Sequence, residues 1–189
     1  MTPALEAAYA EPHRRYHTRR HIEDCLAKLA QVEDLTPAER RTLDRAIWWH
    51  DAIYDPRRSD NEEKSAELAE RELAALGAPS DEIAEVARLI RLTKGHRVEA
   101  ADRLGALLVS IDLAILGADE AGYDAYAAGV REEYAHVPDD AFAAGRRAVL
   151  EAFLAAPALF PDEGFRARLE ATARANLARE FTDLTARRS

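Results

Sequence analysis

The chain has 189 residues and a formal charge of −9, from 26 lysines and arginines against 35 aspartates and glutamates. This charge argues against a general nucleic-acid-binding protein. A single cysteine excludes a disulfide framework, and no signal peptide or membrane-spanning apolar run is apparent, so we expect a cytoplasmic protein without a membrane partner. Leucine, alanine, glutamate and arginine dominate over β-branched residues, which predicts one all-α domain over residues 1–189.

The first predicted helix carries three histidines at four-residue intervals, within EPHRRYHTRRHIEDCL. On a helix, His13, His17 and His21 would lie along one side, beside an apolar stripe that includes Cys25. At least one histidine should therefore face the core, and Cys25 should be a packing residue. Four arginines surround these histidines: Arg14, Arg15, Arg19 and Arg20.

A second helix is predicted to begin after Thr36, which is a suitable N-cap, with Pro37 at the first helical position and Glu39 completing a capping box. One face of this helix would then carry Leu43, Ile47, His50 and Tyr54. His50 is therefore predicted to face the core, with Asp51 beside it at the helix end.

Further helices are indicated along the rest of the chain. Ser59 and Glu62 predict another capping box, for a helix that runs to about residue 76 and ends at Gly77. The next helix is predicted over residues 79–93 and should end near Gly95. Later helix starts are predicted at Asp119, at Pro138 and after Pro161, and the final TARRS segment is expected to fray.

Residues 103–117 include the apolar segment LGALLVSIDLAIL, in which only Ser110 and Asp112 are polar. A helix formed by this segment should be buried, and Asp112 with it. An isolated ionised carboxylate in an apolar interior is strongly destabilising, so Asp112 needs a metal ion, another cation or many hydrogen-bond donors. Taken alone, Asp112 could be an ion-paired structural residue and His50 an ordinary interior histidine, but together they favour a buried divalent metal.

The order of His21, His50-Asp51 and Asp112 resembles the metal-binding signature of the HD superfamily of metal-dependent phosphohydrolases. The segments EPHRRYHTRRHI, WHDAIYD, NEEKSA, LTKGH and DLAILG are similar to a bacterial subgroup of predicted phosphohydrolases in that superfamily, and the similarity covers most of the chain. Ser110 departs from it, since the subgroup is expected to have an acidic residue there. The resemblance implies an HD-type helical bundle that hydrolyses phosphomonoesters or phosphoanhydrides, often of nucleotides.

The predicted metal ligands are His21, His50, Asp51 and Asp112. This mixture of nitrogen and oxygen donors suits Mn²⁺, Fe²⁺, Co²⁺, Ni²⁺, Zn²⁺ or Mg²⁺. Asp51 is also predicted to be catalytic, with Glu62 or His96 as the general acid or base. Glu62 matches the "NE" of the subgroup motif, and His96 is alternatively an ordinary helix-end histidine.

A phosphate ester beside the ion would need cationic or hydrogen-bonding partners. The predicted substrate-binding residues are His17, Arg20, Lys94 and Arg131. The sequence leaves open whether His17 or His21 is the ligand, although His21 fits the family pattern better. Tyr123, Tyr126 and Tyr134 have helical spacing, which is compatible either with a cover over the cleft or with ordinary core packing.

Two other functions stay open at this point. HD scaffolds also include di-iron oxygenases, which would require His17, Glu62 or His96 as further ligands. The chain could instead be a regulatory module that binds a nucleotide without hydrolysing it. The expected partner is a small phosphorylated molecule, and the existence of a homodimer is left open.

Overall fold

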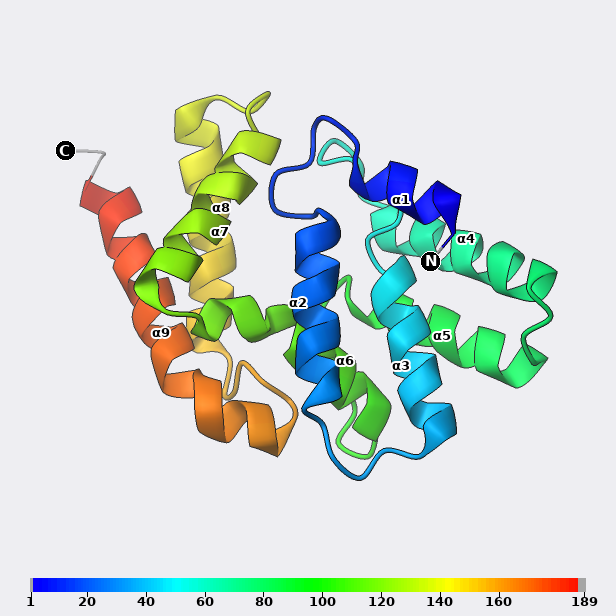
Figure 1. Ribbon diagram of the computed structural model, residues 1–189. Coiled ribbons are helices and arrows are strands. Elements are labelled where there is room, and N and C mark those ends of the chain that lie inside the picture. Colours follow the sequence, from blue (N-terminus) through cyan, green and yellow to red (C-terminus); the bar gives the residue numbers. More distant parts are fainter. Residues whose placement is uncertain (1, 187–189) are drawn as a thin grey trace. The chain divides into compact units, whose positions relative to one another are not determined.

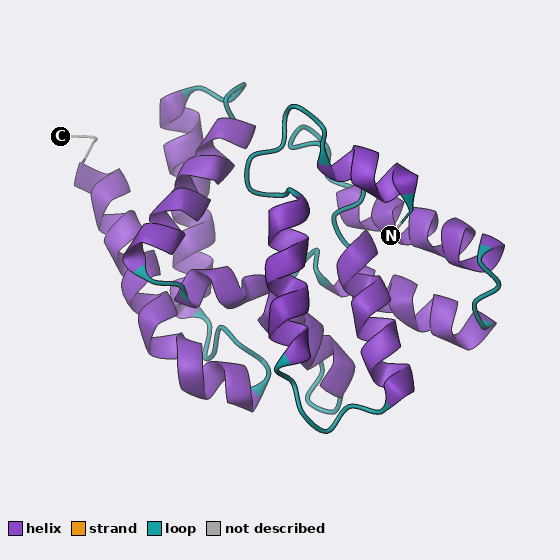
Figure 2. Ribbon diagram, in the orientation of Figure 1, coloured by secondary structure: helices purple, strands orange, loops and turns teal. Residues whose placement is uncertain are grey.

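The computed structural model describes residues 2–186, which form helices and connecting loops and no strand (Figure 2). The all-α prediction is therefore confirmed. The elements are α1 (Pro3–Tyr9), α2 (Arg19–Ala30), α3 (Pro37–Trp49), α4 (Asn61–Ala75), α5 (Ser80–Leu92), α6 (Arg103–Asp112), the 3₁₀ helix η1 (Leu113–Gly117), α7 (Glu120–Glu133), α8 (Asp139–Ala155) and α9 (Glu163–Ala186) (Figure 1). None of these helices has the length and apolar character needed to cross a bilayer.

Internal contacts divide the chain into two compact units, Met1–Asp112 and Leu113–Ser189. The first contains α1 to α6, and the second contains η1 and α7 to α9. The prediction that the whole chain folds as one domain stays a prediction. Fraying of the TARRS segment can be compared only in part, because its last three residues lie outside the described range.

Helix α3 is the centre of the first unit and packs against α2, α4, α5 and α6. Its start is the predicted capping box: Thr36 Oγ1 accepts the Glu39 N–H at 3.2 Å, and the Glu39 carboxylate accepts the Thr36 N–H at 2.8 Å. Leu43 and Ile47 are completely buried, as their spacing predicted. Burial of a side chain of this size stabilises the fold by roughly 1.5–3 kcal/mol.

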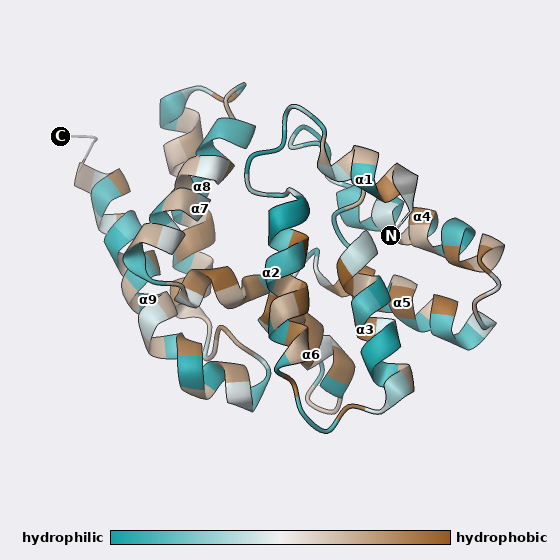
Figure 3. Cartoon of the chain, in the orientation of Figure 1, coloured by the Kyte–Doolittle hydropathy of each residue, from teal (hydrophilic) through white to brown (hydrophobic). Residues whose placement is uncertain are grey.

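The neighbouring helices present apolar residues to the same core. In Figure 3 the ribbons of α4 and α5 alternate between hydrophilic and hydrophobic segments, as expected for helices with one buried face. Fully buried side chains of the first unit include Ile22, Ala66, Leu73, Val86, Ile90 and Leu108. Helix α4 ends as predicted at Gly77, whose φ of +73° allows the left-handed turn and whose successor Ala78 donates to Leu73 O at 3.0 Å.

Three predictions about helix boundaries were wrong. Helix α2 begins only at Arg19, because the extended backbone of Thr18 interrupts any longer helix, so His13 and His17 precede it and form no helical row with His21. Residues 103–117 are not one α-helix, since the chain tightens into η1 after Asp112.

The third concerns the start of α4. Its N-cap is Asp60, without a side-chain capping bond, so Ser59 and Glu62 form no capping box. Asn61 instead fixes the preceding loop, because its side chain accepts the Asp55 N–H at 3.1 Å and donates to Asp55 O at 2.9 Å.

The second unit is organised around α9, which packs against η1 and α8. Asp119 caps α7 as predicted, accepting the Gly122 N–H at 2.8 Å. Tyr123 is fully buried and donates its hydroxyl hydrogen to Glu180 at 2.6 Å, and Arg146 donates to both oxygens of the same carboxylate. Tyr123 is thus a packing residue within this unit, which was one of the two predicted alternatives.

Two glycines of the second unit should respond in opposite ways to replacement by alanine, because η1 lies close to α9 whereas the other glycine has open space around it. A Cβ on Gly117 would lie 2.7 Å from Leu169 Cβ and 3.1 Å from Leu169 O, so Gly117→Ala should lower the free energy of unfolding by about 1–3 kcal/mol. Gly145, inside the exposed part of α8, has no atom within 4 Å of the added Cβ. Gly145→Ala should therefore be stabilising, by roughly 0.5–1 kcal/mol. Thermal unfolding followed by circular dichroism tests both, and an unchanged Tm for Gly117→Ala would contradict the packing argument.

Candidate metal centre

His50 and Asp51 lie where α3 ends. His50 is the C-cap residue, and its N–H still donates to Ala46 O at 2.9 Å, so the helical backbone holds the side chain on the core face. Its ring is 2% exposed, and Nδ1 lies 2.9 Å from the Ile47 carbonyl oxygen. Because a carbonyl can only accept, Nδ1 carries the hydrogen in this bond, which leaves Nε2 facing the interior of the unit as a donor atom for a metal.

His21 reaches the same point from the first turns of α2. Its ring is 4% exposed, and Nδ1 lies 3.0 Å from the hydroxyl oxygen of Tyr16. The Nε2 atom of His21 lies 3.2 Å from His50 Nε2. Two buried ring nitrogens from different helices therefore converge, each ring held by a hydrogen bond on its opposite nitrogen.

Two carboxylates complete this group. Asp112 is the last residue of α6, and its Oδ1 lies 3.2 Å from His21 Nε2 and 3.6 Å from His50 Nε2. Asp51 Oδ2 lies 3.0 Å from His50 Nε2 and 3.7 Å from His21 Nε2. The four side chains predicted as ligands are thus brought together, and we call them the His–Asp cluster.

The spacing of these atoms fits a single metal ion. Ligand bonds of about 2.1 Å at angles of 90–109° put neighbouring donor atoms about 3.0–3.4 Å apart. In the His–Asp cluster the two histidine Nε2 atoms lie 3.2 Å apart, and each carboxylate has an oxygen 3.0–3.7 Å from both of them, which is close to this range. The cluster also combines two carboxylates that are only 17–18% exposed, which require a positive charge nearby. Either protonated histidines or a divalent cation can supply this positive charge.

Protonation of the metal-free cluster follows from these contacts. Burial acts to lower the pKa of His50, but the carboxylates of Asp51 and Asp112 outweigh it and raise that pKa well above its ordinary value. Burial would raise the pKa of Asp51, yet the charge and hydrogen bond of His50 leave it below its usual range. The pKa of Asp112 is likewise lowered against the effect of burial, by hydrogen bonds from His21, His50 and His96. In this state His50 is the proton carrier and both aspartates are ionised.

His96 joins the cluster through Asp112, since its Nε2 lies 3.2 Å from Asp112 Oδ2. It follows α5 and has a φ of +52°, a left-handed conformation that is uncommon for a residue with a side chain. Such a backbone costs on the order of 1–2 kcal/mol and is typical of functional sites. Of the two predictions for His96, its placement favours a role in the site.

His17 lies beside the cluster and not within it. Its ring stacks on Tyr54 with centroids 4.1 Å apart, and it lies 6.1 Å from the His21 ring. It is close enough to Asp51 for its charge to contribute to the lowered pKa of that carboxyl. This position agrees with His21 as the ligand and His17 as a neighbour on the substrate side. His17 reaches this position from a loop, and not from a helix as predicted.

The other predicted residues are not brought to the cluster by any hydrogen bond or ion pair. Glu62 lies partly exposed in the first turn of α4, Arg20 is exposed on α2, and exposed Lys94 donates to Ser59 O at 2.8 Å. Arg131 belongs to the second unit, where it donates to Asp139 and to the carbonyls of Tyr134 and Val137. Roles in catalysis or substrate binding for these residues stay predictions.

Sequence reasoning missed two neighbours of His21. Tyr16, which holds the Nδ1 atom, lies in the loop before α2, where no periodic pattern marks it. Cys25 is buried as predicted, but its Sγ also lies 3.8 Å from both ring nitrogens of His21. Burial, followed by the charge of Asp112, raises the pKa of this thiol well above its usual value. The i, i+4 spacing of His21 and Cys25 on one helix was the available signal.

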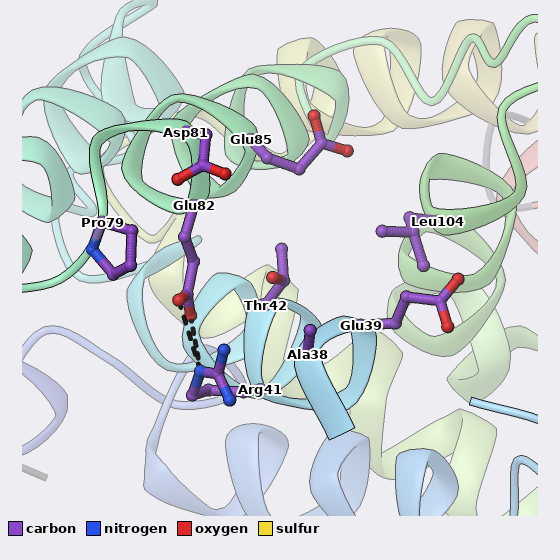
Figure 4. Close-up of a pocket in the computed structure, with 9 residues that line it drawn as sticks. All are labelled: Ala38, Glu39, Arg41, Thr42, Pro79, Asp81, Glu82, Glu85 and Leu104. Carbon is purple, nitrogen blue, oxygen red and sulfur yellow. Dashed lines mark hydrogen bonds and ion pairs between the residues drawn. The ribbon is translucent and has the colours of Figure 1, made fainter. Parts of the chain in front are cut away.

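A separate hollow of about 280 Å³ lies beside the N-terminal half of α3 (Figure 4). It is lined by Ala38, Glu39, Arg41, Thr42, Pro79, Asp81, Glu82, Glu85 and Leu104. Two of its carboxylates already have cationic partners: Glu82 accepts from Arg41 and Arg45, and Glu85 from Arg88. Thr42 and His50 are eight residues apart on one helix, or about 12 Å, so this hollow is distinct from the His–Asp cluster.

Comparison with known proteins gives no match to a family model, a curated sequence or a solved structure. The resemblance to the HD superfamily therefore depends on the residues and segments named above, and it stays a prediction.

Proposed function

We propose that this protein is a divalent-metal-dependent phosphohydrolase of the HD type, acting on a small phosphoester or phosphoanhydride such as a nucleotide. The observation that supports this proposal is that two histidine nitrogens 3.2 Å apart each lie within 3.0–3.7 Å of two carboxylates, at a point supplied by α2, α6 and the end of α3. Purely structural histidines and aspartates need not share one point, whereas metal ligands must.

In this proposal His21, His50, Asp51 and Asp112 would hold the ion. A bound divalent ion supplies Lewis acidity toward a phosphoryl oxygen and lowers the pKa of water, so that a nucleophile is available at neutral pH. The Ile47 carbonyl fixes the orientation of His50 by its bond to Nδ1, and the Tyr16 hydroxyl does the same for His21. Both rings would therefore be oriented before an ion arrives.

The surrounding residues would transfer protons and bind the substrate. His96, which contacts Asp112, is one candidate for proton transfer, and Glu62 is the other. His17, stacked on Tyr54 beside Asp51, would face the phosphate. Arg20, Lys94 and Arg131 are proposed as further cationic groups for the substrate, on the basis of the sequence prediction.

The position of His96 supports a second candidate function. His96 has a nitrogen 3.2 Å from the second oxygen of Asp112, so it could join the His–Asp cluster in holding a second ion, which a di-iron oxygenase requires. Two irons per chain together with oxygen consumption would favour this candidate. Tight nucleotide binding without phosphate release, on the other hand, would favour the regulatory module.

Metal-dependent phosphate release is the first test of the proposal. With Mn²⁺, Co²⁺, Ni²⁺, Zn²⁺, Fe²⁺ or Mg²⁺ added, release should be screened over nucleotides, sugar phosphates and an aryl phosphate. Asp51→Ala should abolish the activity while the helical circular dichroism persists, because Asp51 follows the end of α3 and is not a core packing residue. Asp24→Ala, which removes an exposed carboxylate on α2, is the matched control and should be fully active. Unchanged release by Asp51→Ala at saturating metal is incompatible with the proposal.

Proton release on metal binding is the second expectation. The raised pKa of His50 leaves it protonated near pH 7 in the metal-free protein, so an ion must displace that proton. Each bound Zn²⁺ or Mn²⁺ should release about one proton at pH 7, and the affinity should increase with pH. Calorimetric titrations in two buffers with different ionisation enthalpies measure this number. No proton release would contradict the assignment of His50 as both proton carrier and ligand.

The same pKa shifts predict how the stability of the metal-free protein depends on pH. The folded-state pKa of His50 is above its ordinary value of 6.5, so its contribution is complete below that pH and is lost as the pH rises through the raised pKa. The lowered pKa values of Asp51 and Asp112 have the opposite effect, since their contribution is lost as the pH falls below their ordinary 3.8. With a chelator present, the Tm of the wild-type protein should therefore decline more from pH 6 to pH 9 than the Tm of the His50→Gln variant. Equal declines in the two proteins would contradict this.

Substitution of the two neighbouring histidines tests which one is the ligand. His21→Ala removes a nitrogen of the cluster and should lower metal affinity steeply. His17→Ala should keep the ion and mainly change KM or kcat, by roughly 10–100-fold. Bound metal is measured for both variants at one free-metal concentration. A His17 variant that loses its ion while the His21 variant keeps it would reverse the assignment.

A further inference from the structure

Arg14 is a buried cation in the loop between α1 and α2. The residue is 3% exposed, and its guanidinium group makes four hydrogen bonds. Nε donates to the Glu11 carboxylate at 2.9 Å, Nη1 donates to His17 O at 3.0 Å and to Asp51 O at 2.8 Å, and Nη2 donates to Ala52 O at 3.1 Å. Three of its four acceptors are therefore backbone carbonyls, and two of these belong to the turn that contains Asp51.

This group is placed at the C-terminal end of α3, where a helix leaves carbonyls without partners and carries a partial negative charge. Tyr9 contributes at the same end, donating its hydroxyl hydrogen to Trp48 O at 2.9 Å. The guanidinium also lies over the rings of Tyr9 and Tyr54, at 5.2 and 5.5 Å from their centroids. The favourable contacts explain how a charged group is accommodated in the interior.

We propose that Arg14 is a positioning residue for the His–Asp cluster, which holds the backbone of Asp51 and that of His17 in one fixed relation. The inference rests on the proposed metal site, but it concerns a residue whose hydrogen bonds go to Glu11 and to backbone carbonyls, and not to the side chains proposed as ligands. One nitrogen, Nη1, bonds both His17 O and Asp51 O, so the loop that carries His17 and the turn that carries Asp51 share a single anchor. If either segment moved away, Nη1 would lose its hydrogen bond to that segment, and the two segments would no longer be joined through Arg14.

The geometry of the anchor requires arginine. Only a planar guanidinium offers several donors in fixed directions, whereas the ammonium group of lysine is a compact charge with no fork. Arg14→Lys keeps the positive charge and most of the aliphatic chain, and it should still lose the simultaneous bonds to His17 O, Asp51 O and Ala52 O. The backbone of Asp51 would then be free to shift relative to His50.

Arg40 provides a matched control within the same unit. Its Nη1 donates to Leu29 O at 2.9 Å and its Nη2 to Val32 O at 2.7 Å, at the C-terminal end of α2. The chemistry is the same as that of Arg14, a guanidinium fork on helix-end carbonyls. The end of α2 lies nine residues beyond His21, about 13 Å along the helix, so Arg40 has no contact with the cluster.

The test compares wild-type protein with Arg14→Lys, Arg14→Ala and Arg40→Lys. Folding is checked by circular dichroism and Tm, and the probe is Co²⁺ alone, with affinity from calorimetry and ligand geometry from the visible absorption spectrum of the bound ion. We expect both lysine variants to lose stability, but only Arg14→Lys to bind Co²⁺ on the order of 10–100-fold more weakly and with an altered spectrum. Should Arg14→Ala fold, guanidinium chloride far below denaturing concentrations should partly restore its affinity.

The outcomes separate this inference from the proposed function. If wild-type protein binds no Co²⁺, the metal site itself is wrong. If wild-type protein binds Co²⁺ and folded Arg14→Lys binds it with the same affinity and spectrum, Arg14 only stabilises the fold and the inference is overturned. Equal losses of affinity in Arg14→Lys and Arg40→Lys would also overturn it, because a distant helix end would then have the same effect. If Arg14→Ala does not fold, Arg14→Lys alone decides.

Discussion

The contact between two ionised carboxylates and two imidazoles is the constraint on which the first unit depends. Asp51 and Asp112 are largely withdrawn from water, and neither could stay ionised there without the histidines beside it. The contact in turn dictates where three helices meet, because α2, α3 and α6 must each bring a polar group to one point. Apolar packing around α3 supplies most of the stability, and the polar contact lies where these helices meet.

Helix ends provide the polar groups in this arrangement. His50 and Asp51 lie at the end of α3, Asp112 ends α6, and His96 follows α5. A residue at a helix end can project toward its neighbours without interrupting an apolar face, and the nearby backbone carbonyls fix its orientation, as the Ile47 carbonyl does for His50. The helices thereby hold these side chains in place.

The sequence predicted the features that depend on local patterns. The capping box at Thr36, the core-facing position of His50 and the need of Asp112 for a partner all follow from spacing and from the cost of burying charge. The loop that carries Arg14, Tyr16 and His17 was predicted as helix, because histidines spaced by four residues are typical of a helix face. The hydrogen bonds that hold the loop instead include one to a carbonyl distant in sequence, which no local pattern predicts. The division into two units likewise depends on contacts between residues far apart in sequence.

The arginines at helix ends have a consequence for how this chain ends its helices. Arg174 makes contacts like those of Arg14 and Arg40, donating to the carbonyls of Leu154 and Ala156 at the end of α8. The only lysines of the sequence are Lys28, Lys64 and Lys94, so arginine supplies nearly all of its basic groups. A guanidinium offers several donors in fixed directions, whereas an ammonium group is a compact charge. One such side chain can therefore hold two backbone carbonyls at a helix end, and the composition of the chain supplies this group many times over.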